Sequence, residues 1–277
     1  MKSYPKTLIV ILNYSTYQLT LRLVEELGKL IYPNYKIMVV DNASPNESAV
    51  KLAEMAELKN YIFYKNDVNS GYAAGNNIGI RYAISHGFVY TWILNNDVLI
   101  KDMHILRKMV EVADMKTDIG CVGPQIYYLD GIVYSPYCTR PNLWSMTLGI
   151  AFDKYKRKKQ SGISQKVYRV HGCCMLLRNS VMRQINCMDE STFLYEEENI
   201  LAERMLKAGY YTFYYPETSI IHMESESVKK TQGNRSIKRL KTTFRSMDIY
   251  LKKYRHYNYF SRLVCKAVRG LIIIWRG

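Results

Sequence analysis

Several features that would assign this chain to a familiar class of protein are missing from its 277 residues. No run approaches the roughly 20 apolar residues that a membrane-spanning helix needs. The first apolar run, residues 7–12, is too short for the core of a secretory signal and stands where a first strand would. The six cysteines include no CxxC pair that would indicate a zinc site. We therefore expect a reduced, cytoplasmic chain with no spanning helix.

Glycine is absent from the turn after the first predicted strand, Asn13-Tyr14-Ser15. A dinucleotide-binding fold needs its Gly-rich fingerprint at this turn, and a P-loop needs glycines and a lysine. Both kinds of nucleotide site are therefore disfavoured. Asn13 remains a candidate ligand-binding residue, because open α/β sheets bind ligands outside the carboxyl ends of their strands.

Acidic residues are nearly absent from the C-terminal part of the chain. Residues 228–277 contain 14 of the 39 Lys and Arg residues and a single acid, Asp248. Residues 1–227 then hold 25 basic and 23 acidic residues, so nearly all of the net charge of +15 belongs to this tail. A charge step of this size indicates an anionic partner for the tail: membrane lipid, nucleic acid or an acidic protein face.

Strand and helix signals alternate through the first 125 residues. Short apolar runs that predict strands occupy residues 7–12, 36–40, 61–64 and 89–94. Helical spacing of apolar residues occupies residues 16–30, 46–58, 73–85 and 103–113. Farther on, we expect a buried strand at residues 167–177, a helix at 197–208 and short strands at 211–215 and 219–222. The alternation predicts βαβ units and a mostly parallel sheet.

The tail has an apolar stripe of its own. Spacings of three and four residues, which place side chains on one face of a helix, separate Ile237, Leu240, Phe244, Met247, Leu251 and Tyr254. A basic amphipathic helix of this kind can lie on an anionic membrane. The same stripe could instead pack on the rest of the chain or pair with a second copy, which would make a homodimer.

A polar triplet, Asn95-Asn96-Asp97, separates two apolar runs where a buried strand would reach the edge of its sheet. Ligands of open α/β sheets bind at such edges. A carboxylate flanked by amides at this place suits a hard cation, such as Mg²⁺ or Mn²⁺ on a phosphate. The alternative is a polar turn, where Asn and Asp are favoured in any case.

Two further stretches have the composition of a nucleotide site. Asp41, after the second strand, could accept hydrogen bonds from a base or a ribose, or form a helix-capping turn with Asn42 and Ser44. The stretch Asn69-Ser70-Gly71-Tyr72-Ala73-Ala74-Gly75-Asn76-Asn77 enters a helix. Its small residues let a ligand approach the backbone, and a helix N-terminus favours anions. An ordinary turn and cap is the alternative.

Titratable groups cluster in the second half of the chain. Glu196-Glu197-Glu198 precedes a helical run, where the helix dipole stabilises acids. Crowded carboxylates also raise one another's pKa, which suits a general base. His222 closes the last predicted strand, either as a structural residue or as a ligand of metal or phosphate. The adjacent thiols Cys173 and Cys174 fit small buried hydrophobes better than a redox pair.

In their order and spacing these motifs resemble those of family-2 glycosyltransferases of the GT-A fold. Within that family the chain is similar to the bacterial rhamnosyltransferase-like members that build capsules and cell-wall polysaccharides, over residues 7–230. The resemblance implies an α/β fold with a mostly parallel central sheet flanked by helices. It assigns residues 1–228 to a catalytic domain, with a nucleotide-binding half (1–125) and an acceptor half (126–228), and residues 229–277 to a basic helical tail.

The resemblance also implies a role for each motif. Asp97 would bind the divalent metal, Mn²⁺ or Mg²⁺, and His222 would approach that metal or the diphosphate. Glu198 falls on the general base of the family, and its neighbour Glu197 could take that role instead. Contacts to the nucleotide and donor are implied for Asn13, Asp41, Asn69, Gly71, Gly75, Asn76, Asn95, Asn96 and Arg204.

The chemistry implied is a single inverting displacement, in which a sugar passes from a nucleotide-diphosphate sugar to a saccharide acceptor carried on polyprenyl diphosphate. We then expect a cytoplasmic enzyme held at the inner face of the cell membrane by its tail. A nucleotidyltransferase is a rival interpretation, but it would carry a Gly-rich basic loop after the first strand. A nucleic-acid-binding protein is another, but it needs neither Asp97 nor Glu198, so we expect no nucleic acid partner.

Overall fold

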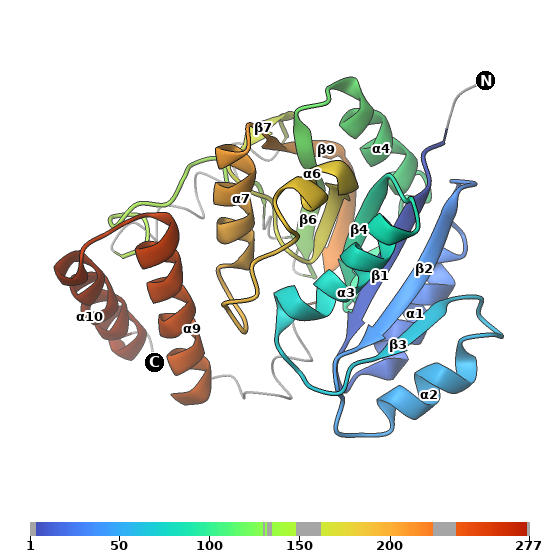
Figure 1. Ribbon diagram of the computed structural model, residues 1–277, viewed down its shortest axis with the longest axis horizontal. Helices are drawn as coiled ribbons and strands as arrows, with labels where there is room; N and C mark the ends of the chain where they lie inside the picture. Colours follow the sequence, from blue (N-terminus) through green and yellow to red (C-terminus); the bar gives the residue numbers. More distant parts are fainter. Residues whose placement is uncertain (1–3, 130, 132–134, 148–161, 224–236, 276–277) are drawn as a thin grey trace.

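The computed structural model describes residues 4–129, 131, 135–147, 162–223 and 237–275. Within these residues nine strands form one sheet, and a pair of C-terminal helices lies beside the body built on it (Figure 1). The predicted boundary between catalytic domain and tail, at residues 228/229, lies outside the described residues.

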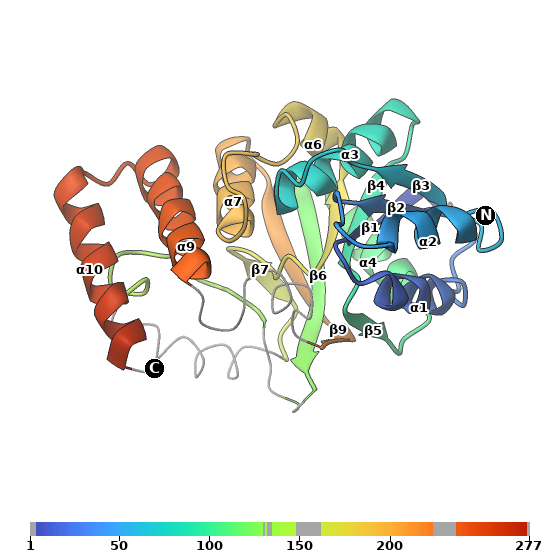
Figure 2. The ribbon, with the colours of Figure 1, turned by 90° about the horizontal axis from the view of Figure 1, so that it is seen from below.

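The first half of the body contains the four predicted strands and the four predicted helices in alternation, and two further strands, at residues 98–100 and 119–128, that were not predicted. Its strands are β1 (Thr7–Asn13), β2 (Tyr35–Asp41), β3 (Ile62–Lys65), β4 (Tyr90–Asn95), β5 (Val98–Ile100) and β6 (Ile119–Tyr128). Its helices are α1 (Tyr17–Leu27), α2 (Ser48–Met55), α3 (Tyr72–Ser85) and α4 (Ile105–Met115). β1 is apolar along most of its length because helices cover both faces of the sheet. Helices α1, α2 and α4 pack on one face and α3 on the other (Figure 2).

The second half of the body extends the same sheet. It adds β7 (Gln165–Val167), β8 (Cys174–Arg178), β9 (Tyr211–His222), α6 (Asn179–Gln184) and α7 (Glu197–Lys207). The strand order is β3-β2-β1-β4-β8-β6-β9-β5, and β7 pairs with β9. Strands β1 to β4 pair in parallel, and the antiparallel ladders of the described residues all involve β8 or β9. The predicted α/β fold with a mostly parallel central sheet is confirmed.

The single strand predicted at residues 167–177 is wrong, because two strands share that run. β7 pairs with β9, whereas β8 pairs with β4 and β6, so the chain crosses the sheet between them. Residues 168–173 form this crossing segment. Arg169, His171 and Gly172 interrupt the apolar run at this crossing, and a glycine inside a strand pattern is a sign of such a break. The two short strands predicted after α7 are in turn one strand, β9, with a register shift opposite residues 124 and 125.

The tail consists of α9 (Ile237–Ile249), a π-helical turn η1 (Tyr250–Tyr254) and α10 (Tyr259–Trp275). α9 lies between α7 and α10 (Figure 1 and Figure 2). Met247, Tyr250 and Leu251 are completely buried, in a cluster that includes Met146 and Ile200 of the body. This part of the predicted apolar stripe therefore packs on the body. Among the described helices, none has the length and apolar character needed to cross a bilayer.

Candidate active site

The carboxyl ends of β1, β2 and β4 meet in a buried network of polar side chains. Nδ2 of Asn13 donates to Oδ2 of Asp41 at 2.7 Å, and Asp41 also accepts from the N–H and hydroxyl of Ser44 at 3.0 and 2.6 Å. Nδ2 of Asn96 lies 2.8 Å from Oγ1 of Thr16 and 3.2 Å from Oδ1 of Asn13. These side chains hold the strand ends together, and the contact predicted for three of them with a donor stays a prediction.

The entry to α3 is closely packed at its two glycines. Gly71 has a φ of 101°, and a Cβ there would lie 2.3 Å from the carbonyl oxygen of Phe193. A Cβ on Gly75 would lie 2.6 Å from Cδ1 of Leu12. Gly71, with its positive φ and a backbone neighbour, therefore requires glycine, whereas a Cβ on Gly75 would need the flexible end of the Leu12 side chain to shift. Their predicted contact with a nucleotide stays a prediction.

Asn69 and Asn76 of the same stretch are hydrogen-bonded within the protein. Oδ1 of Asn69 accepts hydrogen bonds from Nδ2 of Asn42 at 2.9 Å and from the N–H of Gly71 at 3.1 Å. Nδ2 of Asn76 donates to the carbonyl of Tyr72 at 3.0 Å. The stretch thus joins the end of β2 to the start of α3, which places it at the same sheet edge as the network above.

Asp97 and His222 form a buried pair, although 125 positions of the chain separate them. β5 pairs with β9, which places Val98 opposite His222, and the N–H of Met223 donates to the carbonyl of Asp97 at 2.9 Å. Nε2 of His222 lies 3.1 Å from Oδ1 of Asp97, and the two residues are 6% and 3% exposed. Adjacent ligands of an octahedral cation with bonds of about 2.1 Å lie about 3 Å apart. The pair therefore fits Mn²⁺ or Mg²⁺.

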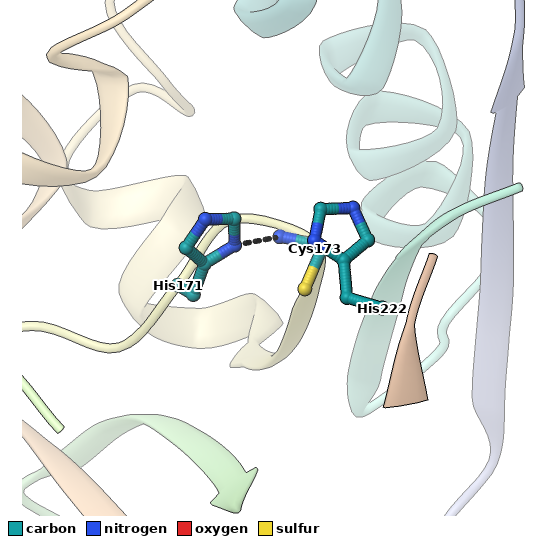
Figure 3. A group of neighbouring side chains, drawn as sticks. All are labelled: His171, Cys173 and His222. Atoms are coloured by element: carbon teal, nitrogen blue, oxygen red, sulfur yellow. Dashed lines mark hydrogen bonds between the residues drawn. The ribbon is translucent and has the colours of Figure 1, made fainter. Parts of the chain in front are cut away.

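The crossing segment brings a second histidine and a thiol to this pair. The ring of His171 lies 5.4 Å from that of His222, and the N–H of Cys173 donates to Nδ1 of His171 at 3.1 Å (Figure 3). Burial raises the pKa of the Cys173 thiol well above its ordinary value, and nearby Cys174 and Asp97 raise it further. Sequence reasoning missed His171 and Cys173 as potential ligands, because their run has no CxxC spacing and their partner stands far along the chain.

The acids at the start of α7 have different surroundings. Oε1 of Glu198 accepts the N–H of Gly172 at 2.9 Å, and its side chain is half-buried. Glu197 is 4% exposed, and its Oε1 has no hydrogen-bond partner within the described part of the chain. Burial and the adjacent charge of Glu198 raise the pKa of Glu197 well above the ordinary 4.5. Glu198 thus reaches the crossing segment beside Cys173, whereas Glu197 is an enclosed acid that favours its neutral form.

Two predicted donor contacts remain, at Arg204 and Asn95. The guanidinium of Arg204 donates to the carbonyls of Cys187, at 2.8 Å, and of Ile185, so it braces the loop after α6. Asn95 is half-buried at the end of β4, and its N–H donates to the carbonyl of Cys173 at 3.0 Å. Asn95 therefore lies beside the crossing segment, while Arg204 supports a neighbouring loop. The donor contact of each stays a prediction.

A family model described as "Glycosyl transferase family 2" matches residues 8–185, well over half of the chain. The low-salt glycan biosynthesis hexosyltransferase Agl10 of Haloferax volcanii is 27% identical over 191 residues, which cover 69% of this chain and 58% of the relative. An N-acetylglucosaminyl-diphospho-decaprenol L-rhamnosyltransferase of Mycobacterium tuberculosis is 25% identical over 146 residues, which cover 49% of this chain and 48% of the relative. The chain thus spans about half the length of these curated relatives.

Solved structures share the fold. The mannosyltransferase PcManGT of Pyrobaculum calidifontis, in complex with GDP-Man and Mn²⁺, has a TM-score of 0.64 and 14% identity over 100% of this chain and 77% of that chain. GalNAc-T7, with UDP, GalNAc and Mn²⁺, has a TM-score of 0.69 and 18% identity over 96% of this chain and 52% of that chain. At these identities the likeness concerns the fold alone. Because the family model, the fold and the order of the motifs agree, this chain belongs to glycosyl transferase family 2 and has the GT-A fold.

Proposed function

We propose that this chain is an inverting, metal-dependent glycosyltransferase. It moves a sugar from a nucleotide-diphosphate sugar to a saccharide acceptor carried on polyprenyl diphosphate, in capsular or cell-wall polysaccharide synthesis. One observation carries the proposal: the Asp97–His222 pair and Glu198 meet at one short turn, residues 171–173. A cation site and a carboxylate at one sheet edge are the two groups that such a transfer needs. The relatives, named as a hexosyltransferase and a diphospho-decaprenol rhamnosyltransferase, support it.

Asp97 and His222 would hold the cation, Mn²⁺ or Mg²⁺, through Oδ1 and Nε2. When bound, such an ion neutralises negative charge that develops on the departing diphosphate. The pairing of β5 with β9 already presents both atoms, so the site requires little rearrangement. Burial of the pair lowers the local dielectric, which strengthens the attraction between the carboxylate and a cation.

Glu198 would remove the proton from the acceptor hydroxyl as that oxygen attacks the anomeric carbon. The N–H of Gly172 fixes one carboxylate oxygen, and the half-buried side chain can still meet an acceptor that arrives from solvent. Glu197 is enclosed, so it suits a supporting role better. A single displacement inverts the anomeric configuration and requires no enzyme nucleophile, so the buried thiols take no part in it.

The nucleotide would lie along the strand ends, between β1 and the start of α3. The residues we assign to this donor site are Asn13, Asp41, Asn69, Gly71, Gly75, Asn76, Asn95, Asn96 and Arg204. Those bonded within the buried network would shape the floor of the site, and the half-buried Asn95 would reach the donor itself. Arg204 would act through the loop that it braces.

The tail, residues 229–277, would hold the enzyme at an anionic membrane, and α10 rather than α9 would make the contact. Met247 and Tyr250 are buried against the body, so their face of the tail is not available. The outer face of α10 is exposed, with Tyr259, Phe260 and Leu271 at 73%, 72% and 67%. Basic residues near an anionic surface contribute about 1 kcal/mol each. The enzyme would then lie peripherally, at the cytoplasmic face of the membrane.

The cation site can be tested in a screen of nucleotide sugars with Mn²⁺ that measures release of nucleoside diphosphate. Asp97→Asn should lower turnover by at least about 100-fold, because a metal contributes several kcal/mol to transition-state stabilisation. Glu57→Gln, which changes an exposed acid after α2, is the matched control and should keep the wild-type rate. Full activity of a folded Asp97→Asn protein would remove the metal assignment.

The membrane contact can be tested by sedimentation with vesicles that contain anionic lipid. Replacing Phe260 and Leu263 of α10 by Ser should weaken binding by about tenfold or more, since a buried large apolar side chain contributes about 1.5–3 kcal/mol. The control replaces Val50 and Leu58, two exposed apolar residues around α2, by Ser and should sediment like the wild type. Equal losses in both variants would contradict a specific role of α10.

A further inference from the structure

His171, Cys173 and His222 form a second set of potential ligands beside the Asp97–His222 pair. One ligand atom from each of the three residues lies within 4.8 Å of the other two. The crossing segment supplies two of the side chains and the end of β9 supplies the third, and the three lie close together (Figure 3). The mechanism proposed above uses only His222 from this cluster.

His222 uses its two ring nitrogens differently. Nε2 lies 3.1 Å from Oδ1 of Asp97, whereas Nδ1 is buried and has no hydrogen-bond partner among the residues that the structure describes. Figure 3 shows one ring nitrogen of His222 turned toward Cys173, on the side of His171. A neutral imidazole has one N–H and one lone pair. A proton on Nε2, donated to Asp97, therefore leaves a lone pair on Nδ1 in a buried place that contains a second imidazole and a thiol.

Two imidazoles and a thiolate are typical ligands of zinc. Zinc sites use these groups in tetrahedral geometry, and three protein ligands leave a fourth position for water or substrate. Affinity at such soft sites rises from Mn²⁺ to Zn²⁺, and Mg²⁺ prefers oxygen. Metal-bound histidines usually donate their other N–H to a carboxylate, which fixes the tautomer. Asp97 stands in that position behind His222.

We propose that His171, Cys173 and His222 bind Zn²⁺, and that Asp97 orients His222 for this purpose. On binding, the Cys173 thiol releases its proton to solvent as the zinc–sulfur bond forms. His222 contributes the lone pair of Nδ1 and keeps its proton on Nε2, where it is donated to Asp97. His171 contributes one ring nitrogen. If this is Nδ1, the hydrogen bond from the N–H of Cys173 is exchanged for the bond to zinc.

The cluster needs a modest adjustment to reach zinc geometry. Tetrahedral zinc with bonds of about 2.0–2.3 Å holds its ligand atoms roughly 3.3–3.7 Å apart. The three atoms, now within 4.8 Å of one another, must therefore close by at most about 1.5 Å. His171 is half-buried in the turn of the crossing segment and has the most room to move, whereas Cys173 is buried in the core. His222 is held in place by β9 and Asp97.

The zinc and the catalytic cation would exclude each other at His222, and this part rests on the proposed function. A catalytic ion would bind the lone pair of Nε2 and leave the ring proton on Nδ1. Nδ1 could then not bind zinc. Zinc takes the lone pair of Nδ1 and leaves the proton on Nε2. One neutral ring cannot offer both lone pairs. Zn²⁺ therefore inhibits sugar transfer by competing with Mn²⁺ and not with the donor.

Cobalt binding tests the site without any assay of sugar transfer. Co²⁺ bound to a thiolate gives a charge-transfer absorption, which the wild-type chain should show with one equivalent of Co²⁺. Cys173→Ser should lack this band and bind Co²⁺ at least about tenfold more weakly, because even a lost outer-shell partner costs that much. The matched control is Cys174→Ser, whose hydroxyl can still accept the hydrogen bond that Trp92 gives to Cys174 at 3.3 Å. Its band should remain.

Each outcome of the cobalt experiment decides the assignment. No band in the wild type, or a band that survives in Cys173→Ser, would overturn the site. If Cys173→Ser does not fold, as judged by near-ultraviolet circular dichroism, His171→Gln takes its place. At least about tenfold weaker Co²⁺ binding by folded His171→Gln would support the site, and unchanged binding would overturn it.

Binding of Mn²⁺, followed through the electron paramagnetic resonance signal of the free ion, separates the two proposals. Zn²⁺ should displace Mn²⁺ from the wild-type chain but not from Cys173→Ser. Simultaneous binding of Zn²⁺ and Mn²⁺ would overturn the exclusion at His222. A cobalt band in a chain that binds no Mn²⁺ would support the zinc site and contradict the catalytic cation instead.

Discussion

Two groups of buried polar side chains at the sheet edge differ in whether their polar atoms have hydrogen-bond partners. Around Asn13, Asp41 and Asn96, polar side chains bond to one another across the strand ends. At the 171–173 turn and the start of α7, Nδ1 of His222 and Oε1 of Glu197 are buried without a hydrogen-bond partner in the described part of the molecule. Because buried polar groups are nearly always paired, each unpaired one needs an explanation. We infer that the first group is scaffold and that ligands complete the second.

The two groups should also contribute differently to the stability of the fold and to the reaction. Each hydrogen bond of the first group contributes about 0.5–1.5 kcal/mol to folding. The unpaired atoms of the second group cost stability, and such costs are typically kept at functional sites. Substitutions in the first group should therefore affect unfolding, and substitutions in the second should affect turnover or the pH dependence of stability.

The largest expected effect is a loss of turnover when Glu198 is replaced. Glu198→Gln keeps an oxygen for the N–H of Gly172 but removes the base, so kcat should fall by about 10²–10⁴-fold. The affinity for the donor and the free energy of unfolding should stay close to those of the wild type. Turnover assays, donor titration and urea denaturation measure the three quantities. If Glu197→Gln stops turnover and Glu198→Gln does not, the base is Glu197.

A smaller effect, on stability, is expected in the first group. Asn96→Ala leaves Asn13, Thr16 and Thr20 short of a buried partner, so the free energy of unfolding should fall by about 1–3 kcal/mol. Urea denaturation measures the change. Gln18→Ala, an exposed position on α1, is the control and should stay within about 0.5 kcal/mol of the wild type. A loss for Asn96→Ala no larger than that of the control would show that Asn96 is not scaffold.

The smallest effect concerns the pH dependence of stability at Glu197. Its pKa is raised in the folded chain, so above the ordinary value of 4.5 the folded state binds more protons here than the unfolded state. The wild type should therefore lose stability relative to Glu197→Gln as pH rises from 4.5 toward the folded pKa. Urea denaturation of both proteins across this pH range measures the difference. A difference that does not change with pH would contradict burial as the cause of the shift.

Much of the first half was predictable from the sequence because its signals are local. The run that forms β1, the helical spacing of Leu23 and Leu27 on α1 and the polar triplet after β4 place these elements without any tertiary information. The break between β7 and β8 was missed, since β7 is short and carries Gln165 and Lys166, so it leaves no apolar run of its own. Its pairing with β9, where β8 pairs with β4, shows that the two strands are separate. In the tail, too, the sequence did not reveal how the helices pack. Its stripe predicts a helix, but not that Tyr250 packs on the body while Phe260 stays exposed.

By itself, the sequence determined the alternation of strands and helices, the family of the chain and the motifs on which the proposed site depends. Only the tertiary structure decided which of these side chains meet. Pairing of β5 with β9 brings His222 to Asp97, and the crossing segment brings His171 and Cys173 to both. Glu198 reaches Gly172 while Glu197 is enclosed, although the two are neighbours in the chain. The physical reason is that the periodicity of side chains is a local property of the sequence. The contacts between these residues depend instead on strand pairing between segments that are far apart in the chain.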